Sequence, residues 1–421
     1  MTRQDCAQVL LIGTADTKAD ELQFMRRCIE EGGGNVLVMD VGILGQAPFQ
    51  PEVSNAEVAA AAGVGLPELA QLGDENQAML HMARGAARLV AQLYEQGRVD
   101  GLLALGGTMG TDLALDAAAA LPLGVPKVVV STIAYSHLVP AERIPADLIM
   151  VLWSGGLYGL NSLCRSSLAQ AAGAVLGACR HAQPPRFDQP LVGITSLGSS
   201  VLSYMKRLKP ALEARGYEVA VFHTTGMGGR SFEDLAEQGR FAAVFDFSLQ
   251  ELANHLGGSC VTAGASRLTG AARAGVPQIV APGATDMVDY PAWSQPSARF
   301  AARPSHAHNR LIASTMGDVA LREEIAREIA VRLQAARAAT CLLLPRAGIE
   351  EWDRAGQPLH DPVGLSAFMA VARAQASAPT EVIELDAHIN DSAFSDAALA
   401  VFDRWVAAGI VVAGATPSSS P

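Results

Sequence analysis

Lysine and aromatic side chains are scarce in this chain. Of its 421 residues only four are lysines, and aromatic residues make up 5%. The formal net charge is −11, and the basic residues form no cluster along the sequence. A protein groove that neutralises a phosphate backbone needs such clusters. We therefore expect no nucleic-acid partner.

Long apolar runs and paired cysteine motifs are also missing. No apolar run reaches the roughly 20 residues of a membrane span, and no basic segment with an apolar core opens the chain. This predicts a cytoplasmic protein without a membrane partner. The cysteines lack C-x-x-C spacing, so we expect reduced, mostly buried thiols and no metal centre. They are Cys6, Cys28, Cys164, Cys179, Cys260 and Cys341.

Small apolar residues are what the sequence has in abundance. Half of the residues are hydrophobic, and the length exceeds one typical core. The proline-rich segment 181–190 cannot continue a helix and is typical of a linker. We predict an N-terminal α/β domain over residues 1–184, with Gly-rich phosphate-binding turns, and a C-terminal α/β domain over residues 190–421.

Both halves alternate apolar strands with helical segments. This order is typical of a parallel sheet, and it predicts two doubly wound, Rossmann-like domains facing each other across a cleft. Two stretches also suggest that the halves repeat one unit. Gly124-Val-Pro126 matches Gly275-Val-Pro277, and the Gly-rich turn 106–111 has a counterpart at 264–270.

The stretch Gly101–Asp112 is the centre of the first half. An apolar strand leads into a Gly-rich turn and then into an Ala-rich helix. Free backbone N–H groups and the positive end of the helix would meet there, which suits a phosphate. The alternative is an ordinary turn between strand and helix. The candidate ligands are Gly106, Gly107, Thr108, Gly110 and Thr111.

A second polar turn, residues 13–18, follows the first strand of the chain. Hydroxyl and ammonium groups there can bind phosphate oxygens, and a carboxylate can hold Mg²⁺ through water. The spacing of a Walker A loop is absent. The alternative is a helix cap with an exposed lysine. The candidates are Gly13, Thr14, Asp16, Thr17 and Lys18.

The second half offers acid–base groups. The stretch 223–233 places His223 and Glu233 around Gly226, Gly228 and Gly229. The two side chains can act as acid and base, or they are a polar strand end and a solvated carboxylate.

Two histidines, His306 and His308, precede Asn309. Metal ligation is one interpretation, but without a further ligand we favour a polar loop that reaches into the cleft. Asp286 belongs to the same candidate site, and no G-x-S-x-G elbow is present.

Several of these motifs together resemble the ATP-binding domain family that is named after the tomato mosaic virus resistance protein. The matching stretches are 13–18, 106–111, 130–132, 159–161, 222–229 with Glu233, 268–270, 275–277, 281–287 and 306–309. The resemblance implies two α/β subdomains, ATP binding with Mg²⁺, and a homo-oligomer. It adds Ser131, Thr132, Gly264 and Asn309 to the ligand residues and His308 and Asp286 to the catalytic ones. The chain departs from the family pattern at 133–137 and at 153–156.

These observations lead to three hypotheses. The first is an ATP- and Mg²⁺-dependent enzyme that acts on a small organic acid in the cleft. The second is a nucleotide-binding sensor or interaction module without turnover. The third, on architecture alone, is a sugar-nucleotide transferase.

Overall fold

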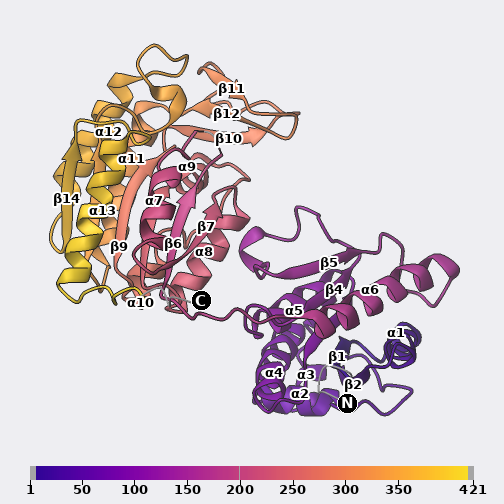
Figure 1. The fold of residues 1–421 in the computed structure, drawn as a ribbon. Coiled ribbons are helices and arrows are strands. Elements are labelled where there is room, and N and C mark those ends of the chain that lie inside the picture. Colours follow the sequence, from indigo (N-terminus) through magenta and orange to yellow (C-terminus); the bar gives the residue numbers. More distant parts are fainter. Residues whose placement is uncertain (1–5, 199, 416–421) are drawn as a thin grey trace. The chain divides into compact units, whose positions relative to one another are not determined.

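The fold is known from a computed structural model, which describes residues 6–198 and 200–415. The chain divides between Arg186 and Phe187 into two compact units. Each unit is built on its own parallel sheet (Figure 1). The predicted α/β class with two Rossmann-like parallel-sheet domains is therefore confirmed.

The N-terminal sheet has the strand order β2-β1-β3-β4-β5, with every neighbouring pair parallel. Its strands are β1 (Gln8–Gly13), β2 (Asn35–Asp40), β3 (Gly101–Gly106), β4 (Lys127–Ser131) and β5 (Leu148–Leu152). Its helices are α1 (Ala19–Glu31), α2 (Asn55–Ala61), α3 (Leu66–Gln71), α4 (Glu75–Glu95), α5 (Thr108–Ala119) and α6 (Ser162–His181), with a short 3₁₀ turn, η2 (Ala141–Arg143).

Helices cover both faces of this sheet because alternate strand residues point to opposite sides. In β1, Leu10 and Ile12 join the core that α2, α4 and α5 complete. Val9 and Leu11 join the opposite core, beneath α1 and α6. Strands buried on both faces explain the continuous apolar runs in the sequence.

The C-terminal sheet has the order β14-β13-β9-β8-β6-β7 and is also parallel. Its strands are β6 (Leu191–Ser196), β7 (Glu218–His223), β8 (Ala243–Ser248), β9 (Gln278–Gly283), β13 (Thr340–Pro345) and β14 (Thr380–Leu385). The helices are α7 (Met205–Glu213), α8 (Met227–Glu237), α9 (Gln250–Gly257), α10 (Gly270–Ala274), α11 (Val319–Gln334), α12 (Pro362–Gln375) and α13 (Ser392–Ala407), with a 3₁₀ turn, η3 (Glu351–Asp353).

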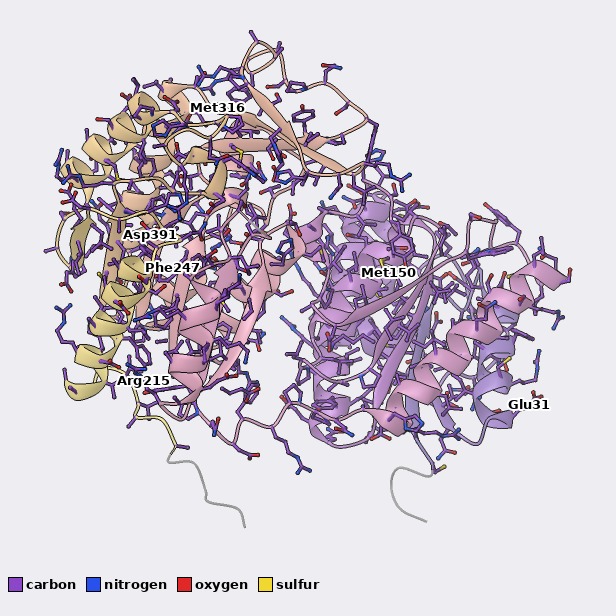
Figure 2. The ribbon with its side chains drawn as sticks, turned by 45° about the horizontal axis from the view of Figure 1, so that its top comes forward. Glu31, Met150, Arg215, Phe247, Met316 and Asp391 are labelled. Atoms are coloured by element: carbon purple, nitrogen blue, oxygen red, sulfur yellow. The ribbon has the colours of Figure 1, made fainter. Side chains whose placement is uncertain are left out.

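One core of this domain lies beneath α7 and α13, and the other beneath α9, α11 and α12. Phe247 of β8 anchors the first (Figure 2). Its ring packs against Tyr204 and Phe394, with centroids 5.3 and 4.9 Å away. A small antiparallel sheet, β10-β12-β11, follows β9 in the chain. Its strands are β10 (Met287–Pro291), β11 (Ser305–Ala307) and β12 (Ile312–Met316).

The two sheets share one topology. Numbered within each domain, the strand order is 2-1-3-4-5, with a sixth strand added in the second. The Gly-Val-Pro motifs each precede the fourth strand, β4 or β9, as the repeat predicts. The predicted correspondence of turns 106–111 and 264–270 is wrong. The first follows the third strand, whereas the second lies between α9 and α10.

Among the described residues, no helix combines the length and the apolar character needed to cross a membrane. All six cysteines are free, but only Cys164 and Cys341 are buried, and Cys260 is exposed.

Candidate functional site

The strand order places a pocket in the N-terminal domain. In a 2-1-3-4-5 sheet the order in which the strands are added reverses between the first and third strands, and ligands bind at the carboxyl ends there. The turns after β1 and β3 meet at this point and line a cavity of about 330 Å³. Its lining residues are Thr14, Asp16, Thr17, Lys18, Ile43, Leu44, Glu75, Met79, Gly106, Gly107, Thr108, Met109 and Gly110. Eight of them were predicted as ligand residues. Gly13, the last residue of β1, is not in the lining.

The first turn of α5 offers backbone donors to this pocket. Gly107 precedes the helix without a side-chain cap, and the first turn carries no acidic residue. The leading N–H groups of a helix have no acceptor inside it. A Cβ on Gly106 would lie 2.4 Å from the carbonyl carbon of Gly110, so glycine is required for this tight turn.

Asp16 is the carboxylate of the pocket. Its Oδ2 accepts the N–H groups of Leu44 and Gly45 at 2.9 and 3.1 Å. Its Oδ1 is buried and has no hydrogen-bond partner among the described residues. A Cβ on Gly42 would lie 2.6 Å from this carboxyl group, so the chain leaving β2 closes tightly over it. One carboxylate oxygen therefore remains for a ligand.

The other polar groups of this turn already have protein partners. Lys18 Nζ donates to the carbonyl oxygen of Leu157 at 2.7 Å and lies 5.1 Å from the ring centre of Tyr158. An ammonium has three donors, so two remain for a ligand. The hydroxyls of Thr14 and Thr17 bond each other at 2.8 Å.

Two residues of the N-terminal domain that were predicted as ligands point into the protein interior instead of into the pocket. Thr111 and Ser131 are buried, and their hydroxyl oxygens are 2.7 Å apart. The Ser131 Oγ also accepts the N–H of Ile133 at 3.0 Å. They tie α5 to β4 rather than line the pocket. Thr132 is also outside the lining, and its N–H donates to the Gly106 oxygen at 3.3 Å.

A second pocket, of about 270 Å³, lies at the carboxyl ends of β6 and β7. It brings together three predicted residues: His223 at the end of β7, and His308 and Asn309 after β11. The stretch 306–309 was expected to be a polar loop, but it begins in β11 and leads into the turn before β12. The remaining lining residues are Leu197, Gly198, Ser200, Thr225, Asp289, Ile312 and Trp352.

Hydrogen bonds link His308 to a buried carboxylate. His308 Nε2 lies 2.9 Å from Ser314 Oγ, and Ser314 Oγ in turn donates to Asp289 Oδ1. Gln250 and Asn254 donate to the same carboxyl group at 3.0 and 2.9 Å. Burial raises the pKa of Asp289, while the Ser314 and Asn254 bonds oppose the rise. Ser314 and Trp352 were not predicted, because neither lies in a recognisable motif.

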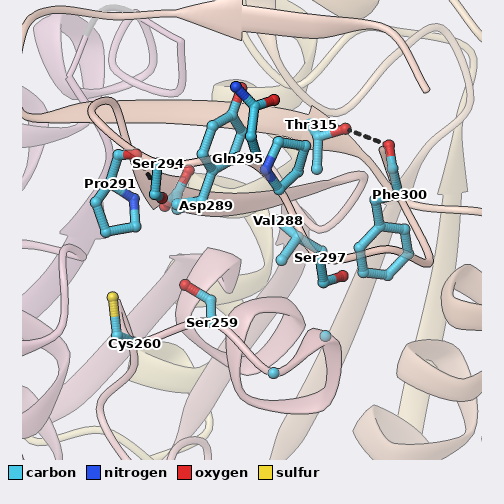
Figure 3. Close-up of a pocket in the computed structure, with 14 residues that line it drawn as sticks. Ser259, Cys260, Val288, Asp289, Pro291, Ser294, Gln295, Ser297, Phe300 and Thr315 are labelled. Carbon is cyan, nitrogen blue, oxygen red and sulfur yellow. Dashed lines mark hydrogen bonds between the residues drawn. The ribbon is translucent and has the colours of Figure 1, made fainter. Parts of the chain in front are cut away.

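Asp289 also borders a third pocket, of about 310 Å³, on the β10–β12 sheet (Figure 3). Ser259 and the exposed Cys260, which follow α9, belong to its lining. The chain from Pro291 to Phe300 closes another side, where Ser294 donates to the Pro291 oxygen at 2.9 Å. None of the predicted site residues lies in this pocket.

Glu233 lies in a buried ion cluster, away from the lining of these pockets. Its carboxyl oxygens accept from Arg267 at 2.9 Å and from the N–H groups of Leu268, Thr269 and Gly270. Arg267 is fully buried and also pairs with Asp246 and Glu251. Burial raises the pKa of Glu233, and Arg267 opposes the rise. We assign Glu233 a structural role.

The glycines predicted as phosphate ligands serve this cluster. The N–H groups of Gly226 and Gly229 donate to Glu251 Oε1 at 2.6 and 3.1 Å. A Cβ on Gly228 would lie 1.8 Å from the His223 oxygen, and one on Gly229 would lie 1.6 Å from Glu251 Oε2. Gly264, with φ +87°, begins the turn that leads to Arg267. Close packing explains these glycines without a ligand.

Asp286 is fully buried, and neither carboxyl oxygen has a hydrogen-bond partner among the described residues. Burial raises its pKa, and the nearby Arg322 opposes the rise. Burial also raises the pKa of Glu350, and Asp286 adds to that rise. Asp286 lies outside the pockets described above. Within the described residues, no three histidine, cysteine or acidic side chains are placed to hold a metal ion.

Known proteins resemble the chain over nearly its whole length. A UPF0261 protein of Brucella suis is 55% identical over 407 residues, 97% of each chain. One of Clostridium tetani is 32% identical over 92% of this chain and 96% of its own. The ToMV resistance protein Tm-1 of Solanum lycopersicum is 28% identical over 93% of this chain, which corresponds to 54% of that protein.

Among solved structures, a UDP-N-acetylglucosamine 2-epimerase matches with 11% identity and a TM-score of 0.22, over 65% of this chain and 79% of that one. A TM-score this low supports no inference about this chain. The N-terminal domain model of the Uncharacterised protein family (UPF0261) matches residues 7–184, and the C-terminal domain model matches residues 189–406. The chain therefore belongs to the UPF0261 family.

Proposed function

We propose that the chain binds Mg·ATP in the N-terminal pocket and uses it in an enzymatic reaction on a small organic acid. One observation carries the proposal. Two turns about ninety residues apart, both predicted to bind phosphate, line a single cavity at the point where the strand order of the sheet reverses.

The chemistry of the lining fits a nucleotide phosphate. The uncapped first turn of α5 supplies N–H donors and the positive end of a helix. Lys18 adds a cation, with donors to spare beyond its bond to Leu157. The apolar side chains of Ile43, Leu44 and Met79 supply the surface on which a base or ribose packs.

Mg²⁺ would be held by Asp16 and Glu75, the two carboxylates in the lining. The buried, unpartnered Oδ1 of Asp16 fits this role. Mg²⁺ usually takes one or two carboxylates, with substrate phosphates and waters completing its shell. Bound there, the ion would neutralise phosphate charge.

A variant at Gly107 tests the site without damaging the fold. This residue has φ −74°, and the nearest atom to an added Cβ is Thr132 Oγ1 at 4.0 Å. Gly107→Asp would place a carboxylate where the phosphate is proposed, while serving as a good helix cap. Gly107→Ala is the uncharged control.

Isothermal titration calorimetry of the full chain with Mg·ATP should show binding by the wild type and by Gly107→Ala, and at least a tenfold loss for Gly107→Asp. Equal affinity in all three would overturn the site. Phosphate release with a panel of small acids then separates an enzyme from a binding module, and competition by UDP-sugars would favour a transferase.

A further inference from the structure

The pocket of the second domain contains two histidines, and neighbouring groups determine which ring nitrogen of each carries the proton. For His308 the neighbour is Ser314, which is fully buried. The hydroxyl has one proton, and that proton goes to the Asp289 carboxylate. Its oxygen can then only accept from His308 Nε2, 2.9 Å away. Neutral His308 therefore carries its proton on Nε2 and a lone pair on Nδ1.

The Nδ1 of His308 is free to receive a proton. It has no hydrogen-bond partner among the described residues, and the side chain is exposed where it lines the pocket. Trp352 holds the ring in place, because its own ring lies 4.7 Å from that of His308 and 4.1 Å from that of His306. Partial burial and the neighbouring His306 lower the pKa of His308, which favours the neutral form.

His223 has the complementary arrangement. Its Nδ1 accepts the N–H of Gly198, at 3.4 Å, so the neutral ring carries its proton on Nε2. That nitrogen has no partner among the described residues. One histidine of the pocket can thus accept a proton and the other can donate one.

We propose that His308 is the general base and His223 the general acid of a proton-transfer site in the second domain, with Ser314 and Asp289 as positioning residues for His308. The substrate is a small carbonyl compound. Nδ1 of His308 takes a proton from the carbon next to the carbonyl group, and the C–H electron pair becomes a C=C bond. The C=O π electrons move to the carbonyl oxygen, which receives the proton from His223 Nε2, and this gives an enol without any oxidant or reductant. Water then returns a proton to His223 and takes one from His308, so that both rings become neutral again.

The arrangement differs from a hydrolase triad. There the histidine lies between the acid and an exposed nucleophilic hydroxyl. Here the serine lies between the acid and the histidine, and it is buried. Ser314 therefore fixes a tautomer and does not attack a substrate.

The lining also limits the substrate. None of the described residues that line the pocket is a lysine or an arginine. A carboxylate would be poorly stabilised inside it, so the part of the substrate that enters is uncharged. The cavity of about 270 Å³ suits a short carbonyl compound. This site rests on the second domain alone and does not depend on ATP binding in the first.

Two measurements on the full chain test the proposal. Nitrogen-15 NMR of the imidazole rings should show His308 with its proton on Nε2, and Ser314→Ala should let both tautomers appear. Proton NMR in D₂O should show that the wild type speeds deuterium entry into dihydroxyacetone and glycolaldehyde. His308→Gln, at an exposed position, should lower that rate about 10²- to 10⁴-fold. His306→Gln is the matched control. His306 pairs with Ser314 only through the backbone of β11 and β12, and its ring lies 5.1 Å from that of His308. Because it makes no side-chain hydrogen bond to Ser314, its loss should change the rate far less than His308→Gln does.

Several results would overturn the proposal. One is His308 with its proton on Nδ1. A second is the same exchange rate in wild type and His308→Gln, and a third is no acceleration of either probe by the wild type. Faster exchange into pyruvate than into the uncharged probes would refute the charge argument. Assays without nucleotide keep these outcomes separate from a failure of ATP binding.

Discussion

Glu233 offers the sharpest contrast between a catalytic and a structural role, and Glu233→Gln separates them. Each carboxyl oxygen accepts two hydrogen bonds: Oε1 from Arg267 and Leu268, and Oε2 from Thr269 and Gly270. A glutamine must turn its NH₂ group toward one of these donor pairs. Two bonds to a charged group are lost whichever way the amide lies.

The cost follows from the number of bonds. Hydrogen bonds to charged groups contribute about 1.5–3 kcal/mol each, so the loss of two predicts about 3–6 kcal/mol of destabilisation. For a domain of this size, that lowers the melting temperature by roughly 6–24 °C. Differential scanning calorimetry and urea unfolding of the full chain measure both values.

Glu237→Gln is the matched control. It lies one turn further along α8 and pairs with Arg273 at the surface, where both side chains are about half exposed. Such a pair contributes about 0–1 kcal/mol. If Glu233→Gln unfolds no more easily than Glu237→Gln, the structural assignment of Glu233 is wrong.

Three further predictions concern the pocket, the pH response and the packing. Asp16→Asn keeps an acceptor for Leu44 and Gly45 but removes the charge of a proposed ligand. The Mg²⁺ affinity of the ATP complex should therefore fall, by calorimetry, at least as far as the roughly 10- to 100-fold that loss of an outer-shell partner costs; an equal loss in the exposed control Asp20→Asn would contradict the role. Burial raises the pKa of Glu251 from 4.5 to about 7, against the effect of Arg267. The Glu251 carboxyl group therefore binds its proton more tightly in the folded state than in the unfolded state. The stability that this protonation contributes is fully present below pH 4.5 and is lost as the pH rises through 7. Urea midpoints should fall from pH 6 to pH 8 less steeply in Glu251→Gln than in the wild type, and equal slopes would refute this. Gly228→Ala should destabilise the second domain by about 1–3 kcal/mol because its Cβ would overlap the His223 carbonyl, whereas Gly239→Ala, with open space around it, tests the effect of its positive φ alone.

The first pocket was predictable because parallel strands align their carboxyl ends. The turns after β1 and β3 meet wherever those strands are neighbours, and both turns carry small polar residues. The apolar strands β1 and β3 and the Gly-rich turns that follow them are local patterns that can be recognised directly in the sequence. Thr111 lies in the first turn of α5 and Ser131 ends β4, and only packing reveals that their hydroxyls face each other.

The second domain was less predictable because its site depends on an inserted antiparallel sheet. Ser314 reaches His308 and Asp289 only through the pairing of β12 with β10 and β11. No sequence spacing encodes that pairing. The stretch with Glu233 and the neighbouring glycines was interpreted as a phosphate-binding turn because a buried ion cluster and a ligand site use the same residue types. The structure favours the ion cluster, because Arg267, which pairs with Glu233, is fully buried.

The central claim is that the pocket at the ends of β1 and β3 binds Mg·ATP, and its most direct test is the melting temperature of the full chain with and without Mg·ATP. At a ligand concentration 100 times the dissociation constant, binding to the native state adds about 2.7 kcal/mol. For a domain of this size, this predicts a rise of roughly 5–11 °C. The wild type and Gly107→Ala should show the full rise, whereas Gly107→Asp, with at least a tenfold lower affinity, should show about half of it or less. No rise with Mg·ATP in the wild type, or the same rise in Gly107→Asp, would contradict the claim.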